Sequence, residues 1–329
     1  MSAAPARVAV LGFGNQGEAQ ALNLRDAGVE VVVGARPGGV SASRAAELGF
    51  ATMALGEAVR SADTVALLLP DEVVPPIARA LVADLRTGAV VVFAHGFNLV
   101  YSDLPFPSGA DVVVVSPTAP GRVLRQVRER GGTLPVYLAV HRDGTGNAWA
   151  RAGAYATAIG GGPFLRTTVR EETEVDLFGE QAVLCGGMNA LVTTAFEVLV
   201  AKGYSPEIAY LECVHQLKYL ADLLHERGVA GLRKGISGTA LYGDLSRGPQ
   251  VIGAAAREAM TALLEQIRSG AFAGEWAREV AGGRRWLDRE VERAAGHPIE
   301  EARRRALAGD GGAPAGGGGN RATPCPKPD

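Results

Sequence analysis

The sequence predicts an α/β fold, with a doubly wound parallel sheet in the N-terminal part of the chain and an all-helical C-terminal part. Short β-branched runs alternate with helical stretches as far as residue 181, and a glycine-rich turn follows the first strand. Only long helical patterns come after residue 181. Such alternation is typical of a parallel sheet covered by helices on both faces. We therefore expect two domains, residues 1–181 and 182–308.

The strands and helices can be placed in order along the chain. Strands are expected at residues 8–11, 29–33, 64–69, 89–93, 111–115 and 136–140. Helices are expected from Gly17 to near Gly28 and, most clearly, at 72–85, 147–159, 182–202, 206–227 and 250–269, with a small-residue turn at 235–244. The tail, residues 309–329, is rich in Gly and Pro and too poor in apolar residues to order itself.

Composition and charge indicate a soluble globular protein. Of its 329 residues, 47% are hydrophobic and 21% are charged, and the net charge of −2 gives no general attraction to nucleic acid or to an anionic membrane. The three cysteines are widely spaced and form no CxxC motif, which argues against a disulfide framework or a zinc site. Because we find no signal-peptide pattern and no apolar run long enough to span a bilayer, we expect a cytoplasmic protein.

The first strand leads into a GxGxxG motif that opens the first helix. The first glycine permits a tight turn, the second lets the backbone approach a pyrophosphate, and the third lets the helix pack closely on the strand. The free N–H groups at the helix N-terminus would then bind the phosphates. A glycine-rich turn without a ligand is the alternative, but the strand–turn–helix–strand context favours a dinucleotide site. The predicted cofactor-binding residues here are Gly12, Phe13, Gly14, Asn15, Gln16 and Gly17.

The segment after the second strand predicts NADPH as the cofactor. An acidic residue there would bind a ribose 2′-hydroxyl, whereas basic and hydroxyl groups suit a 2′-phosphate. The segment has no acid but contains Arg36, Ser41, Ser43 and Arg44. The alternative is that Arg36 is only a solvated loop charge.

Two loops follow predicted strands of the sheet, where such folds carry their chemistry. His95 comes directly after the strand at 89–93, which would place it beside the nicotinamide end of a cofactor. A structural hydrogen-bonding role is the alternative. Residues 116–121 form a second loop, in which two prolines fix the shape but no chemistry is evident.

Two acids lie just before the predicted domain boundary. Asp176 and Glu180 are four residues apart, so their carboxylates share one face of a helix. Such a pair is either a solvated acidic helix start or a pair of Mg²⁺ ligands, because Mg²⁺ prefers carboxylate oxygens, water and substrate. Spacing alone leaves both readings open.

These motifs together resemble the short, class I form of ketol-acid reductoisomerase. The resemblance runs from residue 8 to about residue 300, and its most specific parts are residues 12–25, Leu69-Pro70-Asp71-Glu72, 93–98, 171–181, 184–187, 212–218 and Tyr242-Gly243-Asp244. It implies a Rossmann-type N-terminal domain and a knotted, helical C-terminal domain that dimerises, with the active site shared between subunits. Family enzymes migrate an alkyl group in acetolactate with Mg²⁺ and then reduce the product with NADPH, in valine and isoleucine biosynthesis.

The resemblance also assigns roles to single residues. Asp176, Glu180 and Glu212 match metal-binding acids. His95, Glu180 and Ser237 match catalytic or substrate-contacting positions. Cofactor contacts extend to Leu69, Pro70, Asp71, His95 and Gly121.

Two family positions do not carry over. Thr118 stands where the family has an active-site lysine, and Gln216 stands where it has a fourth metal-binding glutamate. Gly235, Gly238 and Leu241 are lesser departures. Alkyl migration depends on two Mg²⁺ ions, so the loss of a cation and of a ligand charge harms this step more than hydride transfer. We expect one Mg²⁺ site to be retained and the second to be weakened.

Three hypotheses about function follow. The first is an NADPH-dependent reductase of a 2-keto acid, or of a related C=O or C=N substrate, in which Mg²⁺ assists and alkyl migration is weakened or lost. The second is a fully active ketol-acid reductoisomerase that tolerates Thr118 and Gln216. The third is a non-catalytic paralogue that binds nucleotide, which the survival of His95, Asp176 and Ser237 disfavours.

Overall fold

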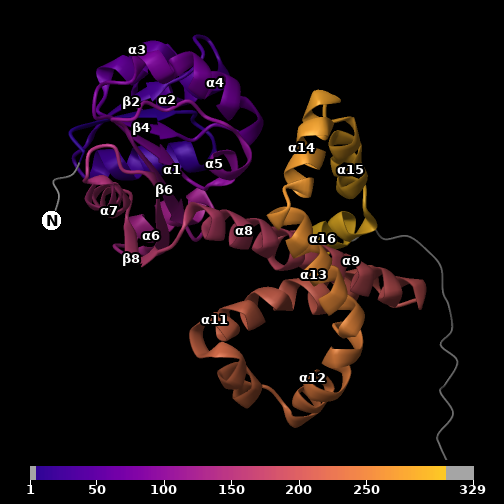
Figure 1. The fold of residues 1–329 in the computed structure, drawn as a ribbon. Helices are drawn as coiled ribbons and strands as arrows, with labels where there is room; N and C mark the ends of the chain where they lie inside the picture. Colours follow the sequence, from indigo (N-terminus) through magenta and orange to yellow (C-terminus); the bar gives the residue numbers. More distant parts are fainter. Residues whose placement is uncertain (1–4, 309–329) are drawn as a thin grey trace, which may run out of the picture. The chain divides into compact units, whose positions relative to one another are not determined.

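A computed structural model describes residues 5–308, and these residues form two compact units (Figure 1). The first unit contains residues up to Gln181 together with Met260–Gly283, and the second contains Ala182–Ala259 and the residues from Arg284 onward. The tail predicted at 309–329 lies outside the described residues.

The first unit is built on one eight-stranded sheet with the strand order β3-β2-β1-β4-β5-β6-β7-β8. Its strands are β1 (Arg7–Leu11), β2 (Glu30–Gly34), β3 (Ala51–Met53), β4 (Thr64–Leu67), β5 (Val90–Phe93), β6 (Asp111–Pro117), β7 (Leu134–Arg142) and β8 (Gly161–Arg166). The order reverses between β1 and β4, and cofactors bind at such a switch point in doubly wound sheets. The predicted α/β fold class is confirmed.

The sheet differs from the expectation in three strands. β7 pairs with β6 in the antiparallel direction, whereas a parallel sheet was predicted. The hydrophobic pattern of a buried strand does not depend on its direction. No local feature of the sequence therefore indicated whether β7 is parallel or antiparallel to its neighbour. β3 and β8 were not predicted, because β3 has only three residues and β8 begins with Gly-Gly-Pro, which is not a strand-like sequence.

Helices cover both faces of the sheet because successive strand residues point to opposite sides. Val8 and Val10 of β1 pack with α1 (Asn15–Asp26), α2 (Val40–Glu47), α6 (Gly121–Glu129) and α7 (Ala148–Ala158). Ala9 and Leu11 pack with α3 (Leu55–Ser61), α4 (Val74–Leu81), α5 (Phe97–Tyr101) and the start of α8 (Val169–Gly179). The helix predicted at 72–85 is α4 flanked by two 3-10 turns, η1 (Asp71–Val73) and η2 (Val82–Asp84).

A later segment of the chain also packs in the first unit. It contains the end of α13 (Ala254–Arg268) and α14 (Ala271–Ala281). The Tyr101 hydroxyl of α5 donates a hydrogen bond to the Ile267 carbonyl at 2.8 Å, and Phe97, Leu177 and Ile267 form a buried cluster. Residues 166 positions apart in sequence are thereby joined.

Every secondary-structure element in the described part of the second unit is a helix. Its elements are α9 (Gly186–Ala201), α10 (Pro206–Tyr210), α11 (Gln216–Gly235), α12 (Gly238–Val251), the start of α13, α15 (Arg285–Ala295) and α16 (Pro298–Ala308), with π-helical turns at η3 (Glu180–Leu184) and η4 (Leu211–His215). Its small core contains Phe196, Ala209, Tyr210 and Ala302. The turn predicted at 235–244 is wrong from Gly238 onward, because Ser237 caps α12 and the helix continues from there.

One continuous helical segment, Val169–Ala201, is long and apolar enough to cross a membrane by length and composition. The expectation that no apolar run reaches this length is therefore wrong. Its most apolar window has a mean hydropathy of 1.7 and is 6% buried within the chain. A single helix of this kind is a weak indication of a membrane span, because apolar helices that pack against other protein surfaces pass the same test.

Candidate active site

The glycine-rich loop lies at the switch point between β1 and β4. Gly12 has a φ of +93°, and a Cβ there would lie 2.5 Å from the Leu68 carbonyl oxygen, so the turn requires glycine. A Cβ on Gly17 would clash with the Gly12 carbonyl, so only glycine lets α1 pack this closely on β1. By contrast, a Cβ on Gly14 would meet nothing within 4 Å. The open space beside Gly14 is where a ligand could approach the backbone.

Two helix N-termini meet beside this loop. The residue before α1, Gly14, provides no side-chain cap, so the first N–H groups of α1 remain available to a ligand. Pro120 provides none for α6 either, but the Arg122 N–H of α6 already donates to the Asn15 Oδ1 at 3.4 Å. The Gln16 amide donates to the Ala119 carbonyl at 3.2 Å, and Gly121 lies directly against the Asn15 carbonyl. The arrangement fits the pyrophosphate of a dinucleotide, because aligned N–H groups and helix dipoles attract anions.

The residues predicted to select the cofactor differ in their availability. Arg36 is exposed after β2 and forms no ion pair with any residue between 5 and 308, and Ser41 lies half-buried in the first turn of α2. Arg44 is already bound to Glu18 through two hydrogen bonds of 2.9 and 3.0 Å. The Phe13 side chain is 5% exposed and belongs to the core, which leaves only its backbone for a cofactor contact.

His95 follows β5 and lies in a hydrogen-bonded network with Asp71. Its Nε2 is 3.1 Å from the Asp71 Oδ2, and the Asn98 amide donates to the Asp71 Oδ1 at 2.9 Å. The Phe97 N–H donates to the His95 Nδ1 in a longer bond of 3.4 Å. The sequence predicted both Asp71 and His95 as site residues, and the fold brings them together from the ends of neighbouring strands.

The surroundings of His95 favour its charged form. Burial lowers the pKa of His95, but the hydrogen bond and charge of Asp71, with the charges of Glu172 and Asp176, more than reverse this and raise it to about 9. Its side chain is 30% exposed, so solvent still reaches the ring. Protonation of the His95 Nδ1 would break the 3.4 Å hydrogen bond from the Phe97 N–H. This bond is weaker than the contact between His95 and Asp71. At neutral pH the imidazole is therefore a cation with a proton to donate.

Glu172 is a site residue that the sequence analysis missed. Its side chain is 3% exposed, its Oε2 accepts a hydrogen bond from the Gly96 N–H at 2.8 Å, and its Oε1 has no partner among the described residues. Burial raises the pKa of Glu172, although the His95 charge and the Gly96 bond partly oppose this. Its spacing of four from Asp176 on α8 was the available signal, but only the fold shows that it reaches the His95 loop.

Asp176 and Glu180 lie at the end of α8 and the start of η3. Burial raises the pKa of Asp176, and burial followed by the charge of Asp176 raises the pKa of Glu180. Two crowded carboxylates of this kind fit a hard cation, which would offset their repulsion. Within residues 5–308, no three His, Cys, Asp or Glu side chains converge as a ready metal site. The two acids could therefore supply only part of a coordination sphere.

Thr118 is tied to a neighbouring strand. Its N–H and its hydroxyl both donate to the Pro135 carbonyl, at 3.1 and 3.0 Å. The Thr118 side chain therefore turns toward the start of β7.

The remaining predicted residues lie in the second unit. Glu212 is exposed in η4, and Gln216 follows it at the start of α11. Ser237 is exposed and caps α12 by accepting from the Ala240 N–H at 3.3 Å. The predicted metal acids Glu180 and Glu212 thus both lie in π-helical turns, which are rare and frequent at functional sites.

Comparisons with known proteins match nearly all of the described chain. The sequence profile of the acetohydroxy acid isomeroreductase NADPH-binding domain matches residues 4–164, and that of the ketol-acid reductoisomerase C-terminal domain matches residues 169–308. A solved structure of an NADH-preferring ketol-acid reductoisomerase from an uncultured archaean is 37% identical, with a TM-score of 0.89 over 93% of this chain and 95% of that chain.

More distant structures share the fold alone. A semialdehyde dehydrogenase NAD-binding protein from Cupriavidus necator, with calcium and NAD, is 20% identical, with a TM-score of 0.62 over 82% of this chain and 99% of that one. An oxidoreductase from Jannaschia is 15% identical, with a TM-score of 0.61 over 80% of this chain and 98% of that one.

Proposed function

Since the chain belongs to the ketol-acid reductoisomerase family and is an NAD(P)H-dependent oxidoreductase of that family, we propose that it acts chiefly as a reductase. Its substrate would be a 2-keto acid or a related C=O or C=N compound, reduced with NADPH. The alkyl migration of the family would be weakened or lost.

The position of Thr118 carries this proposal. The family's lysine would bring a positive charge to the substrate, whereas the Thr118 hydroxyl is held by the Pro135 carbonyl. Alkyl migration builds negative charge on oxygen, so the loss of a preorganised cation slows it by about 100-fold or more. Gln216 also lacks the negative charge of the glutamate that serves as a metal ligand in the family.

The reductive step keeps the groups that it needs. Hydride transfer to a carbonyl requires a bound nicotinamide, an oriented substrate and one proton donor. His95 supplies a proton at an imidazolium nitrogen, and Asp71 holds the ring in place through Nε2. Glu172 fixes the backbone of the same loop through the Gly96 N–H.

Asp176 and Glu180 would hold one Mg²⁺ ion in this proposal, with Glu212 as a further ligand. The ion would polarise the substrate oxygen when bound. Gln216 keeps the shape of the family's glutamate but not its charge, so a second ion would bind weakly.

The preference for NADPH is also a proposal, because the solved relative prefers NADH. It is supported by Arg36, which is exposed just after β2, and by the absence of an acid in that segment, because basic groups there suit a 2′-phosphate. We further propose a homodimer or higher oligomer in the cytoplasm, in which Cys185 and Cys213 stay reduced.

A fully active ketol-acid reductoisomerase is the second candidate function. The 37% identity to a solved member over 93% of the chain favours it, together with the retained Asp176, Glu180 and Glu212. A non-catalytic paralogue is the third, and it has no structural observation in its favour.

Two NADPH-oxidation assays with Mg²⁺ separate these candidates. One uses 2-acetolactate, and the other uses 3-hydroxy-3-methyl-2-oxobutanoate, the product of alkyl migration. We expect turnover of the second compound and little or none of the first. Comparable turnover of both would establish the reductoisomerase, and NADPH binding without turnover of either would favour the paralogue or a different substrate.

The substitution Arg36→Asp tests the cofactor proposal. We expect the ratio of kcat/KM for NADPH to that for NADH to fall by at least about tenfold, the equivalent of one hydrogen bond to a charged group. Arg86→Asp, an exposed charge reversal after η2, is the matched control and should leave the ratio unchanged. An unchanged ratio in Arg36→Asp would refute the role of Arg36.

A further inference from the structure

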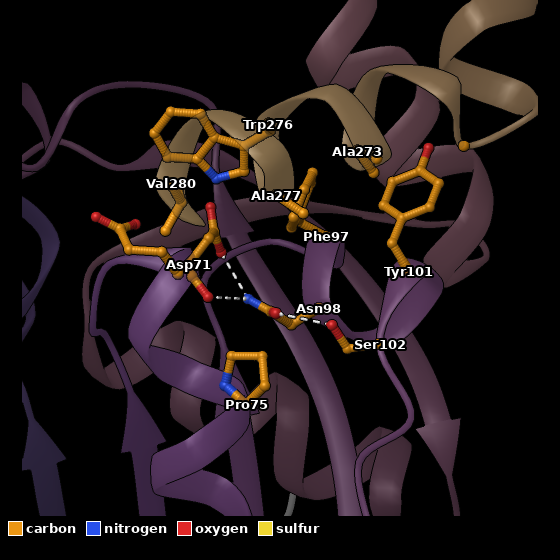
Figure 2. Close-up of a pocket in the computed structure, with 13 residues that line it drawn as sticks. Asp71, Pro75, Phe97, Asn98, Tyr101, Ser102, Ala273, Trp276, Ala277 and Val280 are labelled. Atoms are coloured by element: carbon orange, nitrogen blue, oxygen red, sulfur yellow. Dashed lines mark hydrogen bonds between the residues drawn. The ribbon is translucent and has the colours of Figure 1, made fainter. Parts of the chain in front are cut away.

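Asp71 lines a cavity of about 480 Å³ in the first unit, where α14 covers the loops that follow β4 and β5 (Figure 2). The residue begins the 3-10 turn η1, and its side chain is 34% exposed. A carboxylate beside such open space has room to rotate about its side-chain bonds. Its contact with His95 therefore depends on a second group that holds it in place.

Asn98, in the first turn of α5, binds Asp71 at two points. Its amide nitrogen donates to the Asp71 Oδ1 at 2.9 Å and to the Asp71 backbone carbonyl at 3.2 Å. Figure 2 shows Asn98 between Asp71 and Ser102, with bonds to both. The other carboxylate oxygen, Oδ2, lies 3.1 Å from the His95 Nε2. Both oxygens of Asp71 thus have a fixed partner, and one amide holds its side chain and its backbone together.

The orientation of the Asn98 amide is fixed by the chemistry of its neighbours. An ionised carboxylate and a backbone carbonyl only accept hydrogen bonds, so the nitrogen of the amide, and not its oxygen, must face Asp71. The Asn98 Oδ1 then faces the Ser102 hydroxyl, which donates to it at 3.2 Å. A flipped amide would place its oxygen against two acceptors and leave the Asp71 Oδ1 without a donor.

Burial makes the bonds of Asn98 effective. Asn98 is 2% exposed, so water does not compete for its amide. A hydrogen bond to a charged group is stronger than one between neutral groups, and more so where water is excluded. The bonds also join two loops, because Asp71 follows β4 while Asn98 and His95 follow the neighbouring strand β5. The position of the carboxylate relative to the His95 ring is therefore set by Asn98.

We propose that Asn98 is a positioning residue for the reductive step, which holds the Asp71 carboxylate against the His95 ring. The inference rests on the proposed function, in which His95 supplies the proton. Asn98 acts through Asp71 and donates no proton to the substrate itself. Ser102 supports Asn98 from the opposite side, but it contributes less, because its bond is neutral and does not reach Asp71 directly.

Asn98→Ala tests this role in steady-state kinetics of the full-length protein with NADPH and 3-hydroxy-3-methyl-2-oxobutanoate. We expect kcat to fall by at least about tenfold, because the lost bond is one to a charged group, and the KM of NADPH to change by less than about twofold. Ser102→Ala should lower kcat by less than about threefold. Asn23→Ala is the matched control, since it removes a buried amide that donates to the Ile159 carbonyl, and it should leave kcat unchanged. An unchanged kcat in Asn98→Ala would overturn the proposal.

A double-mutant cycle separates positioning from a general loss of structure. If Asn98 acts through Asp71, adding Asn98→Ala to Asp71→Ala should change kcat by less than about twofold. An independent structural effect would instead multiply with that of Asp71→Ala, and this result would overturn the proposal. Thermal unfolding of each variant shows that the proteins compared are folded.

The ring nitrogens of His95 give a readout that requires no turnover. In heteronuclear NMR spectra, their signals should shift in Asn98→Ala, because the contact between Asp71 and the His95 Nε2 is no longer fixed. The signals of His141, on β7, are the internal control and should not move. Unmoved His95 signals would overturn the proposal. If neither substrate is turned over, the proposed function fails, whereas these signals still decide whether Asn98 positions His95.

Discussion

Three carboxylates of the first unit stabilise the charged form of the His95 imidazole. Asp71 bonds its ring, and Glu172 and Asp176 add their negative charges, so the pKa of His95 rises to about 9. The corresponding value in an unfolded chain is about 6.5. The folded protein thus binds this proton more tightly than the unfolded chain, and the difference contributes to stability.

Stability should therefore fall on the alkaline side of neutrality. Because the folded pKa of His95 lies above the unfolded one, the contribution is fully present below about pH 6.5 and is lost as the pH rises through about 9. In metal-free protein we expect the free energy of unfolding to drop by up to about 3 kcal/mol over this range. Denaturant titrations at several pH values, with EDTA present, measure it.

His95→Gln is the control for this prediction, since Gln keeps a hydrogen-bonding group but cannot titrate. Its free energy of unfolding should stay nearly constant over the same range. The same decrease in both proteins would assign the pH dependence to other groups.

At the scale of elements, the contact between α5 and α8 sets the position of the His95 loop. Gly96 lies directly against α8, where an added Cβ would overlap the Thr173 hydroxyl and lie 2.8 Å from the Val169 Cγ1. The Thr173 hydroxyl is itself held by the Val169 carbonyl at 2.8 Å, so it has little freedom to move away. The close approach lets Glu172 reach the Gly96 N–H.

Gly96→Ala should separate these two helices. We expect a loss of about 1–3 kcal/mol in the free energy of unfolding, because overpacked contacts must relax. The reductase kcat should fall as well, since His95 moves with its loop. Thermal unfolding and steady-state kinetics measure the two effects.

Gly153→Ala is the matched control within α7. A Cβ at Gly153 meets nothing within 4 Å, and alanine favours a helix over glycine by up to about 1 kcal/mol. The control should therefore be neutral or slightly stabilising. Equal changes in the free energy of unfolding for the two substitutions would show that the close contact of Gly96 with α8 is not the cause of the loss.

At the scale of the whole molecule, the second unit exposes apolar side chains along several helices. Val198 on α9 is 57% exposed, Tyr219 on α11 is 54%, and Tyr242 and Leu245 on α12 are 70% and 55%. Apolar surface repeated over neighbouring elements marks a contact with other protein. This exposure supports the proposed dimer and also accounts for the apolar character of Val169–Ala201.

Leu245→Asp should weaken the dimer by placing an unpaired charge in the interface. Sedimentation velocity should show the mass of two chains for the unsubstituted protein and a larger monomer fraction for the variant. Val40→Asp, at an apolar residue that is 88% exposed in the first unit, is the control and should remain dimeric. A monomeric unsubstituted protein would refute the dimer.

Thr118 and Gln216 are the two departures from the family pattern, and the resemblance assigns a role in the active site to each position. Restoring both charges with Thr118→Lys and Gln216→Glu should raise turnover of 2-acetolactate. The gain in turnover of the double variant should exceed the product of the gains of the two single variants. The reason is that both restored charges act on the same negative charge that develops on oxygen during alkyl migration. Thr87→Lys, on an exposed loop, controls for added charge. No gain in the double variant would exclude these positions as the cause of weak isomerisation.

Much of the fold and part of the site could be predicted from local patterns. The strand–turn–helix at residues 7–26 follows from β-branched residues and three glycines whose roles are backbone requirements, and the structure has β1 and α1 there. Asp71 and His95 stood at strand ends and were found in contact. Glu172 was missed because its partner, Gly96, lies 76 residues away and contributes only a backbone N–H.

The sequence by itself determined the α/β class, the dinucleotide loop, and the two family positions occupied by Thr118 and Gln216. These follow from periodicity, glycine geometry and residue identity, which are local properties of the chain. Only the tertiary structure decided the antiparallel direction of β7, the hydrogen bonds of Thr118 to Pro135, and the return of α14 over the Asp71 loop. Each of these depends on contacts between residues far apart in sequence, whose free energy no local pattern records.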